Sequence, residues 1–195
     1  MQTKRKYELK KRAEQVGETR LRITEAAIEL HGSLGPSRTT LSAVAERAGV
    51  ERRTLYRHFP NEADLFAACS THYFAANPLP DLGGWRAIRD PQQRLEQGLD
   101  ELYAYYERTE PMFSNVLRDA EVVEFAREAV APLDAYLGEA AGILMGGRQA
   151  RGRRRELLGG AVRHALAFST WQSLSSNGID RSGAVKLMTA LVEAA

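Results

Sequence analysis

The sequence predicts an all-α protein made of a small N-terminal module and a larger C-terminal helical bundle, for three reasons. Apolar residues recur three and four positions apart along almost the whole chain, and strand-like alternation is nearly absent. A stretch rich in proline and glycine, residues 77–91, interrupts this pattern and separates the two parts. With 195 residues, 44% of them hydrophobic, the chain has enough apolar material for one or two compact cores.

The first predicted helix has one apolar face with charged residues between its apolar positions. That face is formed by Ile23, Ala26, Ala27 and Leu30. The helix should end within residues 31–38, HGSLGPSR, because two glycines and a proline interrupt the pattern there.

A short second helix and a tight turn follow. The same helical spacing is made by Leu41, Val44, Ala45 and Ala48. Thr39 or Thr40 can cap this helix, because a threonine hydroxyl accepts a hydrogen bond from a free backbone N–H group. Gly49 then provides the backbone freedom that a tight turn needs before the next helix.

The third predicted helix, ERRTLYRHF at residues 51–59, separates apolar from cationic side chains. At about 100° per residue, Leu55 and Phe59 point toward a core, and two arginines share the opposite face. These arginines and their flanking residues are Arg53, Arg57, Thr54 and Tyr56. Because a guanidinium group bonds guanine edges or phosphates, the pattern favours a surface that reads nucleic acid. Arginines that are merely solvated are the alternative.

The charge distribution supports this interpretation. Residues 1–60 contain 13 Lys and Arg against 7 Asp and Glu, whereas the remainder contains 14 against 18. A basic first third beside a mildly acidic remainder indicates that the N-terminal module meets a polyanion. A chance imbalance of solvated surface charge is the alternative.

Residues 39–66, TTLSAVAERAGVERRTLYRHFPNEADLF, resemble the DNA-binding signature of TetR-family transcriptional repressors. The resemblance is strong over about residues 19–70, and beyond them only the helical pattern and the AFSTWQSL segment look familiar. In this family, the residue that opens the second helix and the exposed residues of the third helix contact operator DNA. The resemblance therefore implies DNA contacts by Thr40, Ser42, Arg52, Arg53, Thr54, Tyr56, Arg57 and His58.

The sequence departs from the family pattern at Glu62, where the family usually has a lysine that contacts a phosphate. Other basic residues can compensate, and residues 1–18 are predicted to form a flexible basic arm. The basic residues that precede or open the first predicted helix are Lys4, Arg5, Lys6, Lys10, Lys11, Arg12 and Arg20. Such an arm can follow a DNA backbone or enter a minor groove. A disordered, solubilising extension is the alternative.

A fourth helix is predicted from Glu62 to about Ala76, where it would connect the two modules. The expected domains are a helix-turn-helix DNA-binding domain at residues 19–76 and a ligand-binding and dimerisation domain at residues 77–195. Cys69, the single cysteine, cannot form an internal disulfide. It is interpreted as a small core residue, with redox sensing as the alternative.

The C-terminal bundle contains three features that should interrupt its helices. Pro111 is expected to begin a short segment, and Pro132 is expected to kink or divide a long helical pattern. The basic run RQARGRRRE, residues 148–156, lacks apolar spacing and predicts an exposed loop, with a second DNA-binding patch as the alternative.

The last helices have wider apolar coverage than one-sided packing needs. TetR-like proteins dimerise through their last two long helices, so the resemblance implies a homodimer that engages two half-sites. The interface residues expected on this basis are Ala161, Ala165, Phe168, Val185, Met188, Leu191 and Val192. The alternative is that these residues complete a core within one chain.

The resemblance also implies a small-molecule effector that lowers the affinity for a palindromic operator. Candidate pocket residues are mostly aromatic, which favours an apolar or aromatic ligand. They are Tyr103, Tyr106, Met112, Phe113, Leu117, Phe125, Phe168 and Trp171. Plain core packing is the alternative for each of them.

Other classes of protein are less consistent with the sequence. We find no phosphate loop, no GxSxG or HExxH motif and no paired Cys or His ligands, so neither an enzyme nor a metal or cofactor site is expected. A helical adaptor that has lost operator binding is a further alternative. Without a signal peptide or an apolar run of membrane-spanning length, the expected location is cytoplasmic and no membrane partner is expected.

Overall fold

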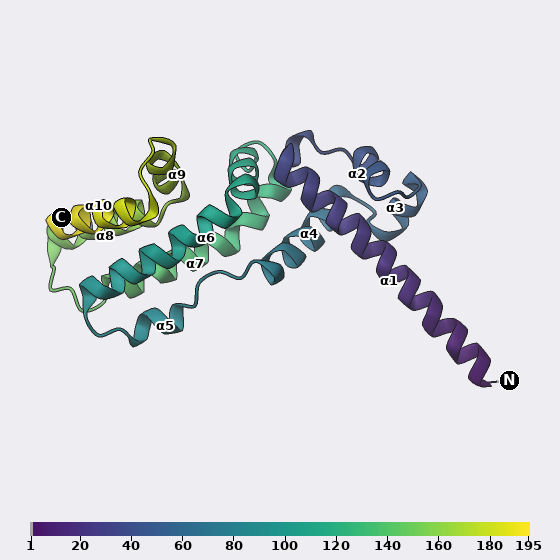
Figure 1. The fold of residues 1–195 in the computed structure, drawn as a ribbon, viewed down its shortest axis with the longest axis horizontal. Helices are drawn as coiled ribbons and strands as arrows, with labels where there is room; N and C mark the ends of the chain where they lie inside the picture. Colours follow the sequence, from purple (N-terminus) through teal and green to yellow (C-terminus); the bar gives the residue numbers. More distant parts are fainter. Residues whose placement is uncertain (1) are drawn as a thin grey trace. The chain divides into compact units, whose positions relative to one another are not determined.

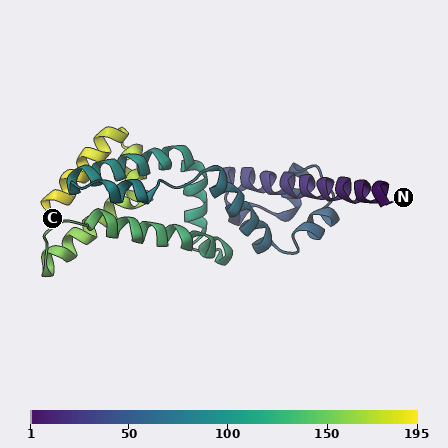
Figure 2. The same ribbon diagram turned by 90° about the horizontal axis from the view of Figure 1, so that it is seen from below.

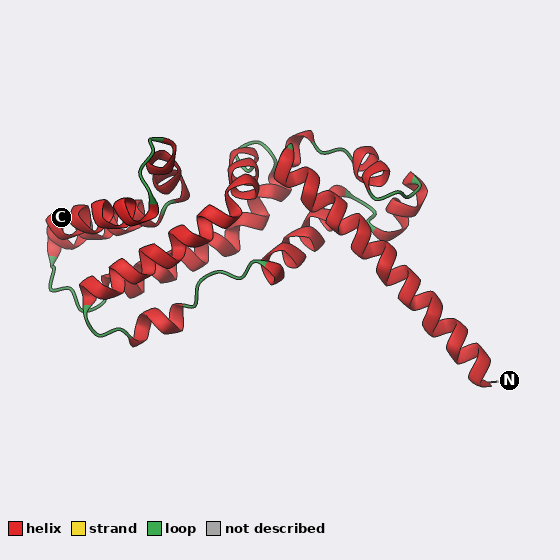
Figure 3. Ribbon diagram, in the orientation of Figure 1, coloured by secondary structure: helices red, strands yellow, loops and turns green. Residues whose placement is uncertain are grey.

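The computed structural model describes residues 2–195, and it describes side chains from Lys6 onward. These residues form ten α-helices and one short 3₁₀ helix, and they contain no strand (Figures 1 and 3). The predicted all-α fold class is therefore confirmed. The chain divides into two compact units, one running up to Asn77 and including Ser114–Ala129, the other made of Pro78–Phe113 and Val130–Ala195.

The first unit contains a three-helix core followed by a fourth helix. Its elements are α1 (Gln2–Ser33), η1 (Pro36–Arg38), α2 (Leu41–Arg47), α3 (Arg52–His58) and α4 (Glu62–Ala76). Helix α1 packs against α2 and α4, and α2 packs against α3. Ile23, Val44, Leu55 and Phe59 are fully buried at the centre of this core, and Cys69 of α4 is buried beside them. The apolar periodicity of each helix thus converges on one core.

Helix α1 begins at Gln2, whereas residues 1–18 were expected to form a flexible arm (Figure 2). Residues 2–18 are rich in Lys, Arg, Glu and Gln, which have high helix propensity. An ion pair one turn apart, between Lys10 Nζ and Glu14 Oε1 at 3.8 Å, adds to the stability of this segment. The side chains of Lys4 and Arg5, two of the predicted DNA-contacting cations, lie outside the described residues.

The second unit is a larger helical assembly. Its elements are α5 (Leu82–Ala87), most of α6 (Pro91–Asp119), most of α7 (Glu124–Met145), α8 (Gly152–Leu166), α9 (Phe168–Ser176) and α10 (Arg181–Ala194). Helix α8 packs against α9 and α10. Fully buried side chains in this unit include Trp85, Leu99, Tyr105 and Leu144.

Both prolines that were expected to divide helices lie inside continuous ones. Pro111 is within α6 and Pro132 is within α7, so the predicted breaks are wrong as helix ends. Both prolines are exposed. A proline has no N–H to donate to the carbonyl group four residues before it, and on an exposed side of a helix water can bind that carbonyl group instead. Each helix passes from one unit to the other within three residues of its proline.

Two segments predicted to lack helices contain them. Residues 77–91 include α5, which buries Trp85 and lets its Nε1 donate a hydrogen bond to Glu101 at 2.6 Å. Within the basic run 148–156, α8 starts at Gly152. Arginine is a good helix former, so an absence of apolar spacing does not prevent a helix from starting there.

Helices α8 and α9 are separated at Ala167, which has an extended backbone. This break leaves carbonyl groups at the end of α8 without helical partners. Tyr103 donates a hydrogen bond to the Ala165 carbonyl at 2.8 Å, and Tyr106 donates one to the Leu166 carbonyl at 2.7 Å. Two buried tyrosines of α6 therefore stabilise the break.

Among residues 2–195, no helix is both long and apolar enough to cross a bilayer. Nor does the described part of the chain gather three or more His, Cys, Asp or Glu side chains that could hold a metal ion.

Candidate nucleic-acid interface

The start of α2 is capped by Thr40. Its backbone is extended, and its Oγ1 accepts a hydrogen bond from the Ala43 N–H at 3.1 Å. This cap satisfies one of the N–H groups that lack helical partners at a helix start. Thr40 and Ser42 are both exposed, so their side chains are accessible at the end of α2 where DNA contacts were predicted.

The turn between α2 and α3 depends on Gly49. Its φ of +63° lies in the left-handed region, which disfavours residues with a Cβ atom. The turn is closed by a hydrogen bond from the Val50 N–H to the Ala45 carbonyl at 3.0 Å. This geometry directs α3 away from the end of α2, as in a helix-turn-helix motif.

Helix α3 presents a cationic face to solvent. Leu55 is fully buried, whereas Arg53 and Arg57 are exposed and have no described ion pair or hydrogen bond in the residues that the structure covers. Their guanidinium donors are therefore available to phosphates or base edges. Arg52 Nη2 donates to the Tyr56 hydroxyl at 3.2 Å, and Thr54 is half-buried at the edge of this face.

His58 occupies a different position from the other predicted DNA contacts. It is half-buried, and burial, together with the positive charges of Arg57 and Arg20, lowers its pKa. Its carbonyl accepts a hydrogen bond from Arg20 Nη1 at 2.8 Å, and the Arg20 guanidinium carbon lies 4.1 Å from the centre of the Phe59 ring. Arg20, which was grouped with the basic arm, thus holds the end of α3 in place.

The last turn of α6 contacts the segment that leads into α2. Asp119 Oδ2 accepts a hydrogen bond from the Ser37 N–H at 2.8 Å, and Asn115 Nδ2 donates one to the Gly32 carbonyl at 2.8 Å. Arg118 donates to the Leu34 carbonyl at 3.3 Å and to Asp119 Oδ1 at 2.8 Å. Three side chains more than 80 residues away in sequence therefore fix the connection between α1 and α2.

This contact also requires Gly35. Its φ of +92° disfavours other residues, and a Cβ atom there would lie 2.4 Å from both Arg118 Nη2 and Asp119 Oδ2. Burial alone would raise the pKa of Asp119, but hydrogen bonds from Arg118 and the Ser37 N–H outweigh it and lower that pKa below its usual value. Asp119 is therefore an ionised, buried acceptor.

We expect Asp119→Ala to lower the free energy of unfolding of the first unit by about 2–4 kcal/mol. The substitution leaves the part-buried Ser37 N–H without its acceptor and removes the anion beside Arg118. Hydrogen exchange of the α1 and α4 amides would measure the change. Asp134→Ala, which removes an exposed carboxylate of α7, is the matched control, and equal protection in the two variants would contradict the assigned role of Asp119.

The predicted pocket residues are divided between the two units. Five of them form one buried cluster in the second unit: Tyr103, Tyr106, Phe113, Phe168 and Trp171. Met112 precedes Phe113 and is half-buried. Leu117 and Phe125 belong to the first unit, where Phe125 lies 5.1 Å from Phe66 between ring centres.

The predicted dimer residues mostly face the interior of their own unit. Those that are buried are Ala165, Phe168, Val185, Met188 and Val192. Ala161 is half-buried, and Leu191 is exposed. Helical spacing marks an apolar face but does not say which partner covers it, and α8, α9 and α10 cover most of this face among themselves.

The compact helical core, the capped α2, the glycine turn and the cationic α3 define a helix-turn-helix DNA-binding protein. The chain belongs to the TetR family of bacterial transcriptional regulators. Residues 23–69 match the family described as "Bacterial regulatory proteins, tetR family".

Related proteins agree with this assignment. The chain is 32% identical over 112 residues to the "Uncharacterized HTH-type transcriptional regulator TtgW" of Pseudomonas putida, a match that covers 47% of this chain and 84% of TtgW. It is 33% identical over 112 residues to the "HTH-type transcriptional regulator SrpR" of Pseudomonas putida, covering 47% of this chain and 53% of SrpR. The matched part of the chain thus spans about half the length of SrpR.

Solved structures share the fold over most of the chain. NalD, the secondary repressor of the MexAB-OprM multidrug efflux pump in Pseudomonas aeruginosa, superposes with a TM-score of 0.64 at 22% identity. That match covers 93% of this chain and 96% of NalD. A TetR-like transcriptional regulator from Rhodococcus sp. RHA1 gives a TM-score of 0.65 at 18% identity, covering 90% of this chain and 93% of that protein.

Proposed function

We propose that this DNA-binding regulator is a homodimeric repressor that a small effector releases from a palindromic operator. In this proposal the first unit binds DNA, and the second unit binds the effector and the partner subunit. The observation that carries the proposal is the exposed pair Arg53 and Arg57 on α3, whose guanidinium groups have no described partner in the part of the chain that the structure covers. The proposed DNA contacts are Thr40, Ser42, Arg52, Arg53, Thr54, Tyr56, Arg57 and His58.

Binding to genomic DNA tests this function directly. Fragments recovered with the protein by chromatin immunoprecipitation should contain an inverted repeat, and gel shifts with those fragments should weaken steeply as salt rises. Weak, unsaturable binding to every fragment would instead favour the alternative, an adaptor that has lost operator binding. Glu62 is the sequence feature behind that alternative. It is exposed at the start of α4, whose N-cap Asn61 accepts a hydrogen bond from the Asp64 N–H at 2.8 Å.

The proposed effector is an apolar or aromatic molecule, and the aromatic cluster of the second unit supports this choice. Both tyrosine hydroxyls in the cluster already bond to carbonyl groups at the end of α8, so the remaining surface that the cluster offers a ligand is mainly apolar. Adding candidate aromatic compounds to the gel shift tests this proposal. An effector should raise the protein concentration needed for half-maximal binding, as linkage between the two sites requires.

The dimer interface that we propose lies on the outer faces of α8 and α10, which pack against each other (Figure 1). Leu157 of α8 is 48% exposed, and Leu187 and Leu191 of α10 are 47% and 45% exposed. The two leucines of α10 lie one turn apart, and the exposed Ala190 and Ala194 extend the same apolar stripe. A second copy of this stripe would remove the leucines from water.

We expect Leu187→Glu to shift the protein from dimer to monomer at micromolar concentration, because a carboxylate buried at the interface costs several kcal/mol. Sedimentation velocity measures this shift. Lys186→Glu, which places a carboxylate at the neighbouring exposed position, is the control and should leave the dimer intact. If wild-type protein sediments as a monomer, or if both variants remain dimeric, the proposed interface is wrong.

A further inference from the structure

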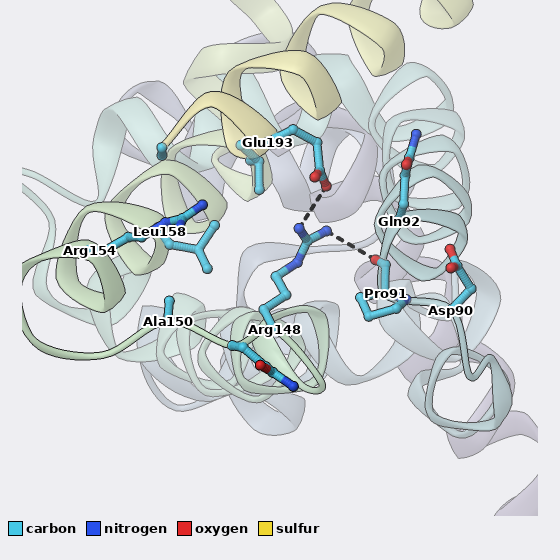
Figure 4. A pocket seen from close by; sticks show the side chains of 11 residues that line it. Asp90, Pro91, Gln92, Arg148, Ala150, Arg154, Leu158 and Glu193 are labelled. Atoms are coloured by element: carbon cyan, nitrogen blue, oxygen red, sulfur yellow. Dashed lines mark hydrogen bonds and ion pairs between the residues drawn. The ribbon is translucent and has the colours of Figure 1, made fainter.

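The second unit contains a cavity of about 280 Å³ where the start of α6, the connection between α7 and α8, and the end of α10 meet (Figure 4). Its apolar lining includes Leu158 and Val192, both buried. Polar side chains line the rest, and Figure 4 shows Arg148 between Glu193 and Pro91, with Gln92 nearby. The cavity therefore combines an apolar wall with a fixed cationic group.

Arg148 is held by groups on three different elements. Its side chain is only 11% exposed. Nε donates to the Leu144 carbonyl at 3.3 Å, Nη2 to the Pro91 carbonyl at 3.0 Å and Nη1 to Glu193 Oε1 at 2.7 Å. A guanidinium group has five N–H donors, and these contacts account for three of them. Arg148 is thus a rigid donor whose orientation is set before any ligand arrives.

The surroundings of the cavity are positively charged. Residues 148–156 contain five arginines and one glutamate. Arg154 lines the cavity and has no described ion pair or hydrogen bond within the covered residues. Arg151, the N-cap of α8, makes no side-chain cap, so the first N–H groups of α8 add their partial positive charge at this end. The lining contains two carboxylate side chains, Asp90 and Glu193, and also the last residue, Ala195, with its backbone carboxylate. Glu193 is paired with Arg148.

We propose that this cavity binds a small organic anion, whose carboxylate or phosphate group lies between Arg148 and Arg154. Its short apolar body would contact the accessible apolar part of the lining, which includes Pro91 and Leu158. Small-molecule sites typically enclose about 300–1,000 Å³, so a cavity of about 280 Å³ suits a ligand of few heavy atoms. The Glu193 carboxylate competes with the ligand anion for the Arg148 guanidinium. The bound anion replaces part of the hydrogen bonding that Glu193 provides to Arg148. None of the residues of the aromatic cluster lines this cavity.

Calorimetric titration of the full chain at low ionic strength, with three probes of similar size, tests the proposal. Butyrate and butyl phosphate carry the two head groups, and butanamide has the shape of butyrate without its charge. At least one of the two anions should bind saturably, and the tighter of the two identifies the preferred head group. Butanamide should not bind, because its neutral head group has no negative charge to pair with the two arginines. Equal binding of butyrate and butanamide would overturn the proposal.

Three substitutions separate this site from general surface charge. Arg154→Gln should weaken anion binding about tenfold, which corresponds to roughly one charge-assisted contact. Glu193→Gln should strengthen it by a similar factor, about tenfold, because the competing carboxylate is gone. Arg155→Gln, on the same exposed turn but outside the cavity lining, is the matched control and should have no effect.

The opposite signs expected for Arg154→Gln and Glu193→Gln cannot arise from a general loss of folding. Equal losses in Arg154→Gln and Arg155→Gln would instead assign the binding to diffuse charge and refute the site. An absence of anion binding in both wild type and Glu193→Gln would refute it as well.

Discussion

Alanine at both Arg53 and Arg57 should abolish most of the affinity for operator DNA, with each single substitution costing about 1–3 kcal/mol. Both guanidinium groups are exposed, and neither has a described partner in the covered part of the chain, so their removal takes no stabilising contact from the folded protein. The loss therefore reflects contacts with DNA alone. Fluorescence anisotropy with a labelled operator, at fixed salt, measures it.

Arg89→Ala provides the control, because Arg89 is an exposed arginine of the second unit and its removal changes the net charge by the same amount. The salt dependence distinguishes the two roles that an arginine can have. A phosphate contact lowers the affinity for all sequences and reduces the salt slope by about one, whereas a base contact relaxes specificity at one position. Wild-type affinity in both Arg53→Ala and Arg57→Ala would contradict the proposal that this face of α3 contacts DNA.

The helix-turn-helix motif could be predicted because its determinants are local. The apolar positions of α2 and α3, the threonine cap and the glycine turn all lie within 20 residues, and each leaves its own mark on residue type and spacing. Periodicity alone placed Leu55 and Phe59 toward the core, and both are fully buried. It also placed Arg53 and Arg57 on the opposite side, where the structure leaves them exposed.

Neither residue type nor spacing in the sequence indicates the contact between the end of α6 and the connection that precedes α2. Asn115, Arg118 and Asp119 look like ordinary polar residues at the end of a helix, and their partners are mainly backbone groups. A backbone carbonyl or N–H is present at every residue, so sequence pattern cannot identify it as a partner. Gly35 was recognised only as a helix breaker, although its missing Cβ also makes room for Arg118 and Asp119.

The sequence predicts which face of each C-terminal helix is apolar better than it predicts which part of the protein covers that face. Apolar spacing in α8 and α10 correctly marks residues that avoid water, but Val185, Met188 and Val192 are buried within the unit. Leu157 and Leu187, which were absent from the expected interface, are among the apolar residues that remain exposed. The partner of an apolar side chain is decided by tertiary packing, which periodicity does not contain.

We expect the first unit to lose about 3 kcal/mol of stability between pH 6.5 and pH 4 through His31 alone. Burial lowers the pKa of this imidazole from 6.5 to about 4, and the negative charge of Asp119 opposes that shift only in part. His31 is packed 4.9 Å from Phe66, measured between ring centres, and its lowered pKa keeps it mostly neutral in the folded chain down to about pH 4. In the unfolded chain His31 takes up a proton near pH 6.5. The free energy of unfolding is therefore unaffected by His31 above that pH, and it falls on acidification because only the unfolded state binds this proton.

Hydrogen exchange of the α1 and α4 amides measures this dependence, because both tryptophans, Trp85 and Trp171, lie in the second unit and would not report on the first. His31→Gln should flatten the decline between pH 6.5 and pH 4, whereas His72→Gln, at an exposed position of α4, should keep it. Equal slopes in these two variants would show that His31 is protonated in the folded chain. Since His31 directly precedes the segment held by Asn115 and Asp119, the same acid range should weaken DNA binding in wild type more than in His31→Gln.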